Sequence, residues 1–442
     1  MQRTTLIRIA ALSALAGGAA AQPLLTEVAE IQPSFDDSSS QFGWAVVASS
    51  GKLAVSAPLN VISGSNTGRV LVYDAATLQL EQTLQPDTVG DDFFDTFGNS
   101  MDFRDGLVLV GRNGQDAIAT NSGAAYLFDA ATGALLDTYT QQLPAPNPLN
   151  AGFGAQVALS GGNAAIAANG ENSLTFVDTA TGAQIGRLLG GQTQPRIAFG
   201  AIFQGSSELA DGSGALKAAT LDSPDAVFVE LDPVTGTTAT NTIAGVNPVA
   251  PGGFSRALAI SGDLAVVGAG GFADSSGNPP TAAYAFDLST NTLLHEWLPV
   301  PNTDQFFGYR VAIDGELAVI TSRNADDEAF VYDVITGERI AELGSTTPFE
   351  RIWDAAIEGN TAYLGVNDVG LSGSGRVLVY DLGALSDCPA DTNGDGQLDP
   401  SDFNAWVIAF NSSTPECDQN ADGLCNPADF NAWVANFNAG CD

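Results

Sequence analysis

The sequence predicts an all-β fold, a seven-bladed β-propeller, followed by a small α-helical module at the C-terminus. Its 442 residues include 49 glycines and 21 prolines but only 15% charged side chains, a composition typical of many short strands joined by tight turns. An apolar strand that ends in Asp recurs seven times, at intervals of 46 to 55 residues, between about residues 24 and 385. A repeat of this length with four strands is typical of a propeller blade. All four cysteines and two Asp-rich loops lie in the last 55 residues, which indicates a separate module.

Residues 1–21 have the pattern of a secretory signal. Arg3 and Arg8 precede an apolar stretch at residues 9–16, and a run of three alanines ends at Ala21. This order predicts cleavage after Ala21, and a buried N-terminal helix is the alternative. We therefore expect a secreted protein that is extracellular or associated with the cell surface.

The formal net charge is −36, from 51 acidic and 15 basic side chains. Proteins that bind nucleic-acid backbones or anionic membranes need clustered Lys and Arg, so we expect neither as a partner. No apolar stretch reaches the length of a membrane-spanning helix, about 20 residues. The 45% hydrophobic content excludes a disordered chain. We therefore expect no membrane span, a propeller at residues 22–385 and a helical module at residues 386–442.

Each repeat carries two phrases. One is a strand that ends in Asp, often followed by Thr-Gly; the Asp side chain is expected to cap the turn and the Gly to supply a positive φ. The other is an aromatic residue, usually in Phe-Gly, before an alternating strand, a Gly turn and an apolar strand. The aspartates are Asp74, Asp129, Asp178, Asp232, Asp287, Asp333 and Asp381, and the phenylalanines are Phe42, Phe97, Phe153, Phe199, Phe254, Phe307 and Phe349. Each repeat therefore predicts four short strands.

The two ends of the repeat region predict how a ring would close. Residues 24–33 stand before the first Phe-Gly, in the place of a blade's outermost strand, whereas the last repeat, residues 349–381, supplies only three strands. We therefore expect the N-terminal strand to complete the seventh blade, which leaves little open strand edge. A sandwich or a β-helix is the alternative, but neither explains seven units of this length.

The first repeat resembles the FG-GAP family of repeat propellers, which includes integrin head domains. The resemblance rests on Phe42-Gly43, on Ala57-Pro58 and on the strand from Gly68 to Asp74. Many FG-GAP blades also carry an Asp-rich calcium loop. The corresponding turns here include Ser49-Ser50-Gly51, so that feature is not transferred to this chain.

Two loops in the tail, 27 residues apart, have the ligand spacing of an EF-hand calcium loop. Oxygen donors stand at loop positions 1, 3, 5, 9 and 12, glycine stands at position 6, and position 7 contributes its backbone carbonyl. The ligands are Asp391, Asn393, Asp395, Gln397, Asp399 and Asp402 in the first loop, and Asp418, Asn420, Asp422, Leu424, Asn426 and Asp429 in the second. Because a hard cation takes six to eight oxygens, the loops predict two Ca²⁺ ions; ordinary Asp and Asn turns are the alternative.

A helix is expected after each loop. It begins at Pro400 or Pro427, the favoured first helical residue, with Asp399 or Asn426 as the cap. Apolar side chains recur at helical spacing at Phe403, Trp406, Val407 and Phe410, and at Phe430, Trp433, Val434 and Phe437. We expect these side chains to form the core between the two loop–helix units, and direct contact with a partner is the alternative.

The tail resembles a dockerin, a module of two calcium loops that are each followed by a helix. The segment Cys388 to Asp391, the paired Asp-Phe-Asn-Ala-Trp runs and the closing Gly440-Cys441 are similar to GC-type dockerins. The resemblance implies attachment to a cohesin-like receptor or to the cell surface. Loop positions 10 and 11, which help to set partner choice in cellulosomal dockerins, are Pro400-Ser401 and Pro427-Ala428 here.

The four cysteines allow three disulfide pairings. We favour Cys417 with Cys425, which clips the second loop, and Cys388 with Cys441, which joins the ends of the module. Zinc binding is the alternative, but the sequence lacks a paired Cys-x-x-Cys pattern.

The sequence contains no catalytic motif of the hydrolase, metalloprotease or phosphate-loop type. The single histidine, His295, is expected to be structural. Paired carboxylates serve glycoside hydrolysis, but we expect the acidic clusters of this chain to lie in solvated loops. These clusters are Asp91, Asp92 and Asp95, and Asp326, Asp327 and Glu328. The sequence favours a secreted, non-catalytic binding or adhesion protein whose propeller presents loops to an unknown protein or carbohydrate. The alternative is a dockerin-borne carbohydrate-active enzyme with its site on the propeller face.

Overall fold

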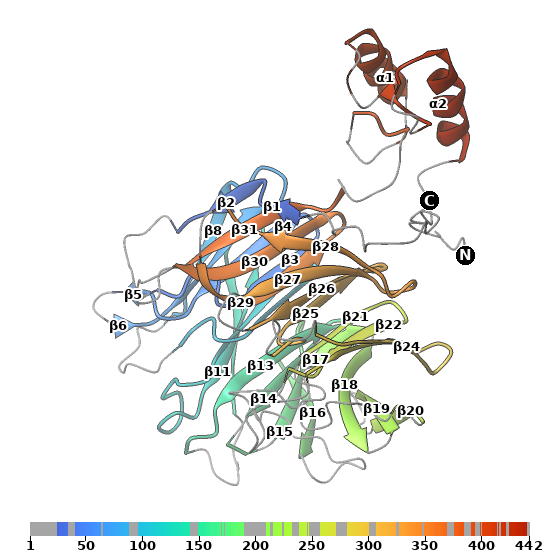
Figure 1. The fold of residues 1–442 in the computed structure, drawn as a ribbon. Helices are drawn as coiled ribbons and strands as arrows, with labels where there is room; N and C mark the ends of the chain where they lie inside the picture. The colour runs from blue at the N-terminus through green and yellow to red at the C-terminus, as the bar shows by residue number, and fades with distance from the viewer. Residues whose placement is uncertain are drawn as a thin grey trace. The chain divides into compact units, whose positions relative to one another are not determined.

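The computed structural model is mostly β-structure, in several small antiparallel sheets, with two short helices near the C-terminus (Figure 1). The chain divides into two compact units: one spans Pro23–Tyr380, and the helices belong to the other, which includes Asp381–Asp442. The residues that the structure describes are 24–33, 40–62, 65–87, 96–141, 149–168, 170–171, 173–189, 209–212, 215–222, 225–231, 238–244, 246, 257–270, 281–299, 306–323, 327–346, 349–368, 375–383, 390–393, 398, 400–412, 414, 417–420 and 424–439. The predicted signal segment, Phe199, Asp232, Phe254, Cys388 and Cys441 lie outside these residues.

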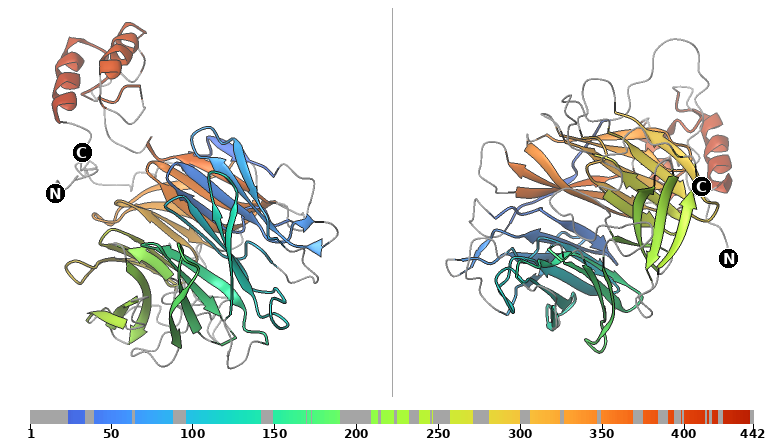
Figure 2. Two further views of the ribbon diagram at one scale, coloured as in Figure 1. Left: turned by 180° about the vertical axis from the view of Figure 1, so that it is seen from behind. Right: turned by 90° about the horizontal axis from the view of Figure 1, so that it is seen from below.

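The strands of the larger unit form sheets that succeed one another along the chain (Figure 2). The first contains β3 (Val46–Ser49), β4 (Lys52–Ala57), β7 (Arg69–Asp74) and β8 (Leu80–Leu84), and the second β9 (Met101–Arg104), β10 (Leu107–Arg112), β11 (Ala124–Asp129) and β12 (Leu135–Thr140). The third contains β13 (Phe153–Ser160), β14 (Asn163–Ala168), β15 (Ser173–Asp178) and β16 (Gln184–Leu189), and the fourth β17 (Leu209–Gly212), β18 (Ala215–Asp222), β19 (Asp225–Leu231) and β20 (Thr238–Ile243). The fifth contains β21 (Ala257–Ser261), β22 (Leu264–Gly268), β23 (Ala283–Asp287) and β24 (Thr292–Trp297).

The last two sheets also take up strands from the N-terminal segment. The sixth contains β25 (Val311–Asp314), β26 (Leu317–Ser322), β27 (Glu328–Asp333), β28 (Arg339–Gly344) and β1 (Leu24–Thr26), and the seventh β29 (Phe349–Glu358), β30 (Thr361–Asp368), β31 (Gly375–Asp381) and β2 (Ala29–Ile31). A small hairpin of β5 (Val61–Ile62) and β6 (Ser65–Asn66) lies between β4 and β7 in the sequence. The first strands of successive sheets contact one another in the order β3, β9, β13, β17, β21, β25 and β29, and β29 contacts β3.

The N-terminal segment differs in part from the expected single strand. β2 pairs antiparallel with β31, as expected for the outermost strand of the last sheet, but β1 pairs in parallel with β28 of the preceding sheet. Between them, the carboxylate of Glu27 accepts hydrogen bonds from the hydroxyl and the backbone amide of Thr346 and from the hydroxyl of Ser345. Partial burial opposes ionisation, but these hydrogen bonds outweigh it, so the pKa of Glu27 lies below its ordinary value. The segment therefore links two sheets.

The Phe-Gly phrase forms the contact between neighbouring sheets. The side chains of Phe42, Phe97, Phe153 and Phe307 are at most 1% exposed. Gly154, which follows Phe153, has a φ of +86°, and a Cβ there would lie 2.2 Å from the carbonyl oxygen of Ala124 in the preceding sheet. Gly43 occupies the same place in the first sheet and faces Gly365 of the last one. Only glycine combines this φ with so close an approach of two backbones.

The strand-end aspartates cap their turns as predicted. The Oδ1 atoms of Asp129 and Asp178 accept hydrogen bonds from the amides of Thr132 and Thr181, at 2.7 and 2.8 Å, and from the hydroxyls of the same threonines. The glycine that follows has a φ of +70° at both Gly133 and Gly182. Equivalent hydrogen bonds are present at Asp74, Asp287, Asp333 and Asp381. The turn chemistry predicted from the sequence is therefore confirmed at these positions.

Candidate metal-binding module

Two helices of equal length follow the predicted loops: α1 (Pro400–Ser412) and α2 (Pro427–Ala439). Both begin at the predicted proline. The Asn426 side chain caps α2 by accepting a hydrogen bond from the amide of Ala428 at 2.9 Å, and Asp429 Oδ2 accepts one from the amide of Asn426 at 2.7 Å. This reciprocal pair of bonds is a capping box, which fixes Asp429 against the end of the second loop.

The acids at position 12 of the two loops, Asp402 and Asp429, are completely buried. Asp429 Oδ1 accepts a hydrogen bond from the amide of Gln419 at 3.1 Å, and Asp402 Oδ1 one from the amide of Asn393 at 3.4 Å. Each acid therefore connects the start of a helix with the start of its own loop. The sequence has no Lys, Arg or His after Arg376 that would neutralise these carboxylates. Because burial of a carboxylate is costly and the segment after Arg376 supplies no basic side chain, this donor set fits a hard cation with oxygen ligands.

The structure describes eight of the twelve predicted metal ligands. Asp391, Asp418 and Asn426 are partly buried, Asn393 and Asn420 are exposed, and Leu424, predicted to bind through its carbonyl only, is 65% exposed. Asp395, Gln397, Asp399 and Asp422 lie outside the described residues. Within the described part of the chain, no three acidic, His or Cys side chains converge on one point. The ligand set therefore remains a prediction that rests on loop spacing and on Asp402 and Asp429.

One of the two predicted cysteine pairs lies in the described module. Cys417 and Cys425 are paired in a disulfide across the second loop, with their Cα atoms 5.6 Å apart, within the range that a disulfide spans. The equivalent positions of the first loop hold Ala390 and Leu398, so the first loop has no such link.

The aromatic stripes form only part of the expected core. Trp406 and Trp433 are 5% and 6% exposed and pack with Ala390, with Val407, Phe410 and Phe437 partly buried around them. Phe403, Phe430 and Val434 are 38%, 42% and 37% exposed. Phe403 and Phe430 still contact the tryptophan of the other helix, so the expected core between the two units is present but leaves the outer side of each stripe exposed.

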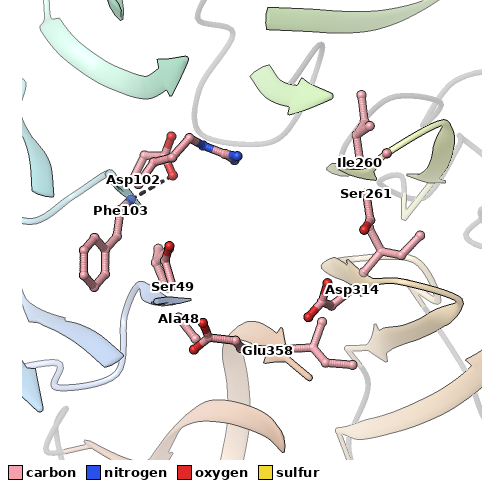
Figure 3. A pocket seen from close by; sticks show the side chains of 13 residues that line it. Ala48, Ser49, Asp102, Phe103, Ile260, Ser261, Asp314 and Glu358 are labelled. Atoms are coloured by element: carbon pink, nitrogen blue, oxygen red, sulfur yellow. Dashed lines mark hydrogen bonds between the residues drawn. The ribbon is translucent and has the colours of Figure 1, made fainter. Parts of the chain in front are cut away.

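The larger unit has a polar cavity of about 350 Å³ where the first strands of five sheets end (Figure 3). Ser49, Asp102, Ser261, Asp314 and Glu358 line it together with Arg104. In Figure 3 these side chains lie around the opening, with Ser49, Glu358 and Asp314 along one side of it and Asp102 and Ser261 on the others.

These cavity carboxylates hold neighbouring sheets together. Asp314 Oδ2 accepts a hydrogen bond from the amide of Gly359 at 2.6 Å, and Glu358 Oε1 one from the amide of Gly51 at 3.1 Å. Ser261 Oγ accepts one from the amide of Gly315 at 3.0 Å in the same way. Each side chain bonds to the first turn of the following sheet, and the last sheet bonds to the first. Sequence reasoning missed these residues, although the phrases Ile260-Ser261-Gly262, Ile313-Asp314-Gly315 and Ile357-Glu358-Gly359 repeat one pattern.

Asp102, which also lines the cavity, and two further aspartates connect neighbouring sheets. Asp102 Oδ2 accepts a hydrogen bond from the amide of Leu159 at 2.6 Å, and Asp354 Oδ2 one from the amide of Val46 at 2.9 Å. Asp327 Oδ2 accepts one from the amide of Ile352 at 2.7 Å and is 8% exposed. The expectation that Asp327 lies in a solvated loop is therefore wrong, because a neighbouring sheet covers it. Asp91, Asp92, Asp95 and Asp326 lie outside the described residues.

His295 has a structural environment. Its Nε2 lies 2.9 Å from the carbonyl oxygen of Ile335, and its ring stacks on Trp297 at a centroid distance of 5.9 Å. Trp297 in turn donates a hydrogen bond to the carbonyl oxygen of Gly337 at 2.9 Å. The pair therefore joins β24 to the last turn of the next sheet.

Comparison with known proteins informs the fold alone. No protein-family model and no curated protein matches the sequence. Among solved structures, a chain from the "Crystal Structure of Mitotic Checkpoint Complex" is similar over 86% of this chain and 99% of that chain, with a TM-score of 0.52 and 14% sequence identity. Neither helix of the described chain has the length and apolar character needed to cross a membrane.

Proposed function

We propose that this chain is a secreted, non-catalytic binding or adhesion protein. Its β-unit presents loops to a ligand, and its helical module folds around two Ca²⁺ ions and attaches the protein to a cohesin-like receptor or to the cell surface. The observation that carries the proposal is the complete burial of Asp402 and Asp429 in a module without a basic side chain. When bound, the ions would supply the missing positive charge and draw the loop oxygens together.

For the larger unit we propose a seven-bladed propeller of the FG-GAP type. The contacts between first strands support this architecture, because they run through all seven sheets and return from β29 to β3. The glycines of the Phe-Gly phrases support it as well. Gly43 of the first sheet lies against Gly365 of the last sheet, just as Gly154 lies against Ala124 of the preceding sheet. Closure of this kind leaves the loops at both ends of the sheets available to a ligand, which is the common use of a propeller scaffold.

The exposed surface of the helical module supports attachment to a protein. Phe403 and Phe430, which are equivalent in the two units, are partly exposed and lie 6.1 Å apart between ring centroids. Ile408 on α1 is 66% exposed. Apolar side chains that remain exposed around a small helical pair are typical of a protein interface.

The polar cavity at the ends of the first strands is where a carbohydrate-active enzyme, the alternative, would place its acids. Asp102, Asp314 and Glu358 each accept a hydrogen bond from a neighbouring sheet, which accounts for their presence by a structural role. We therefore favour the binding function.

Affinity capture tests the proposal. The full-length chain is immobilised and incubated with an extract of the native cell envelope, with calcium or with a chelator. We expect one protein partner to be retained with calcium and released by the chelator. The variant Asp402→Asn/Asp429→Asn should not retain it, whereas Asp314→Asn, in the other unit, should. Retention that survives both the chelator and the double variant would contradict calcium-dependent attachment.

A further inference from the structure

Each tryptophan of the helical module donates a hydrogen bond to the entrance of the opposite loop, meaning the residue that directly precedes the calcium loop of the other loop–helix unit. Trp406, on the helix after the first loop, donates a hydrogen bond from Nε1 to the carbonyl oxygen of Cys417 at 3.2 Å. Cys417 is fully buried and directly precedes Asp418, the first predicted ligand of the second loop. Trp433, on the helix after the second loop, donates from Nε1 to the carbonyl oxygen of Ala390 and to Thr392 Oγ1, both at 3.2 Å. Ala390 is also fully buried and directly precedes Asp391, the first predicted ligand of the first loop.

The crossing is symmetric at the level of side-chain packing as well. Phe403 packs on Trp433 at a centroid distance of 5.2 Å, and the equivalent pair, Phe430 and Trp406, lies at 5.6 Å. The two indoles themselves are 6.3 Å apart. Neither helix can therefore move away from its partner without also moving the entrance of the opposite loop.

A continuous path joins the two predicted ion sites. Asp402 closes the first loop and lies one helical turn before Trp406, so both project from the same face of α1. An ion held by Asp402 would also fix the first turns of α1 and, through Trp406, the carbonyl next to Asp418. Asp429 and Trp433 provide the same path in the opposite direction.

We propose that Trp406 and Trp433 are positioning residues that couple the two calcium loops, so that an ion in one loop orders the entrance of the other. This inference rests on the proposed calcium binding of the module. The two hydrogen bonds exist only when both units are folded against each other. Binding of the first ion then orders part of the second loop, so the second ion binds with a smaller loss of conformational entropy. This is positive cooperativity.

Calcium titration of the full-length protein, by calorimetry or by competition with a chelating dye, tests the coupling. We expect the wild type to bind two ions with a Hill coefficient above 1. In Trp406→Phe/Trp433→Phe, which keeps the aromatic packing but removes both N–H donors, we expect half-saturation at a roughly ten-fold higher calcium concentration and a Hill coefficient of about 1. Trp297→Phe is the matched control: this buried indole also donates to a carbonyl, but in the β-unit, and its loss should leave calcium binding unchanged.

A second measurement separates coupling from a general loss of packing. Asp391→Ala, which removes a predicted ligand of the first loop, should weaken calcium binding by the second loop in the wild-type background but not in the Phe/Phe background. If the double variant lacks the helical signal of the wild type at saturating calcium, Trp406→Phe and Trp433→Phe are titrated singly, and each should lower the Hill coefficient. A wild type that binds two ions independently, or a Hill coefficient that the substitutions leave unchanged, overturns the coupling while the proposed calcium binding stands. A wild type that binds no calcium overturns both.

Discussion

Gly154→Ala is the substitution that tests most sharply how the sheets meet. The φ of Gly154 is +86°, a conformation that costs an L-residue about 1–2 kcal/mol. The new Cβ would also lie 2.2 Å from the oxygen of Ala124 and 3.1 Å from the nitrogen of Arg112. Both are backbone atoms of the preceding sheet, so the contact is relieved only if one sheet shifts, and overpacking of this kind costs about 1–3 kcal/mol. We expect a total destabilisation of about 2–5 kcal/mol.

Gly162→Ala, in the turn between β13 and β14 of the same sheet, is the matched control. Its φ of +82° imposes the same backbone cost, but a Cβ there has no neighbour within 4 Å. We expect it to cost only about 1–2 kcal/mol. Urea unfolding of both full-length variants, followed by tryptophan fluorescence, gives the comparison. Equal losses of stability at the two positions would refute the claim that the Phe-Gly phrase is needed for close contact between sheets.

Three further predictions concern other contacts. The pKa values of Asp74, Asp129 and Asp178 lie below the ordinary 3.8 because threonine hydroxyls and amides donate hydrogen bonds to these carboxylates. These hydrogen bonds therefore stabilise the fold above pH 3.8, and the stabilisation is lost as the pH falls through the lower folded-state pKa values. Urea unfolding across this pH range should show the loss, and Thr132→Val should make it smaller. Asp354→Ala leaves the amide of Val46 unpaired between the last and first sheets and should cost about 1–3 kcal/mol in the same assay, whereas the exposed Glu338→Ala should cost nothing measurable. Replacing Cys417 and Cys425 by Ser removes a disulfide that restricts the unfolded second loop and so stabilises the folded loop by about 2 kcal/mol. Calorimetry should therefore show weaker calcium binding. An unchanged affinity would mean that the disulfide does not preorganise the second loop.

The features that sequence reasoning predicted well are those with local causes. The Asp-capped turns depend on an aspartate, the threonine three residues on and the glycine after it, as at Asp129 to Gly133, and all of that information lies within one short segment. The start of α2 is equally local, since Pro427 and the Asn426 cap suffice to place it.

The features that sequence reasoning missed depend on residues that are distant in the chain. Asp327 reaches the amide of Ile352 in the next sheet, and the pattern of residues around it does not distinguish such an acid from a solvated one. The N-terminal segment divides between two sheets because Leu24–Thr26 finds the free edge of β28, more than 300 residues away, which no property of the segment itself indicates. The exchange of tryptophan hydrogen bonds between the two loop–helix units is likewise a property of their packing and not of either repeat alone.

We propose that Asp402 and Asp429, buried in a module without basic side chains, make this module a calcium-folded attachment domain. Isothermal calorimetry of the full-length chain with calcium tests it most directly, compared with Asp402→Asn/Asp429→Asn. We predict two ions per chain for the wild type, accompanied by a gain in helical circular dichroism, and neither effect for the double variant. Absence of binding by the wild type at about 1 mM calcium, the upper range for extracellular modules, would contradict the claim.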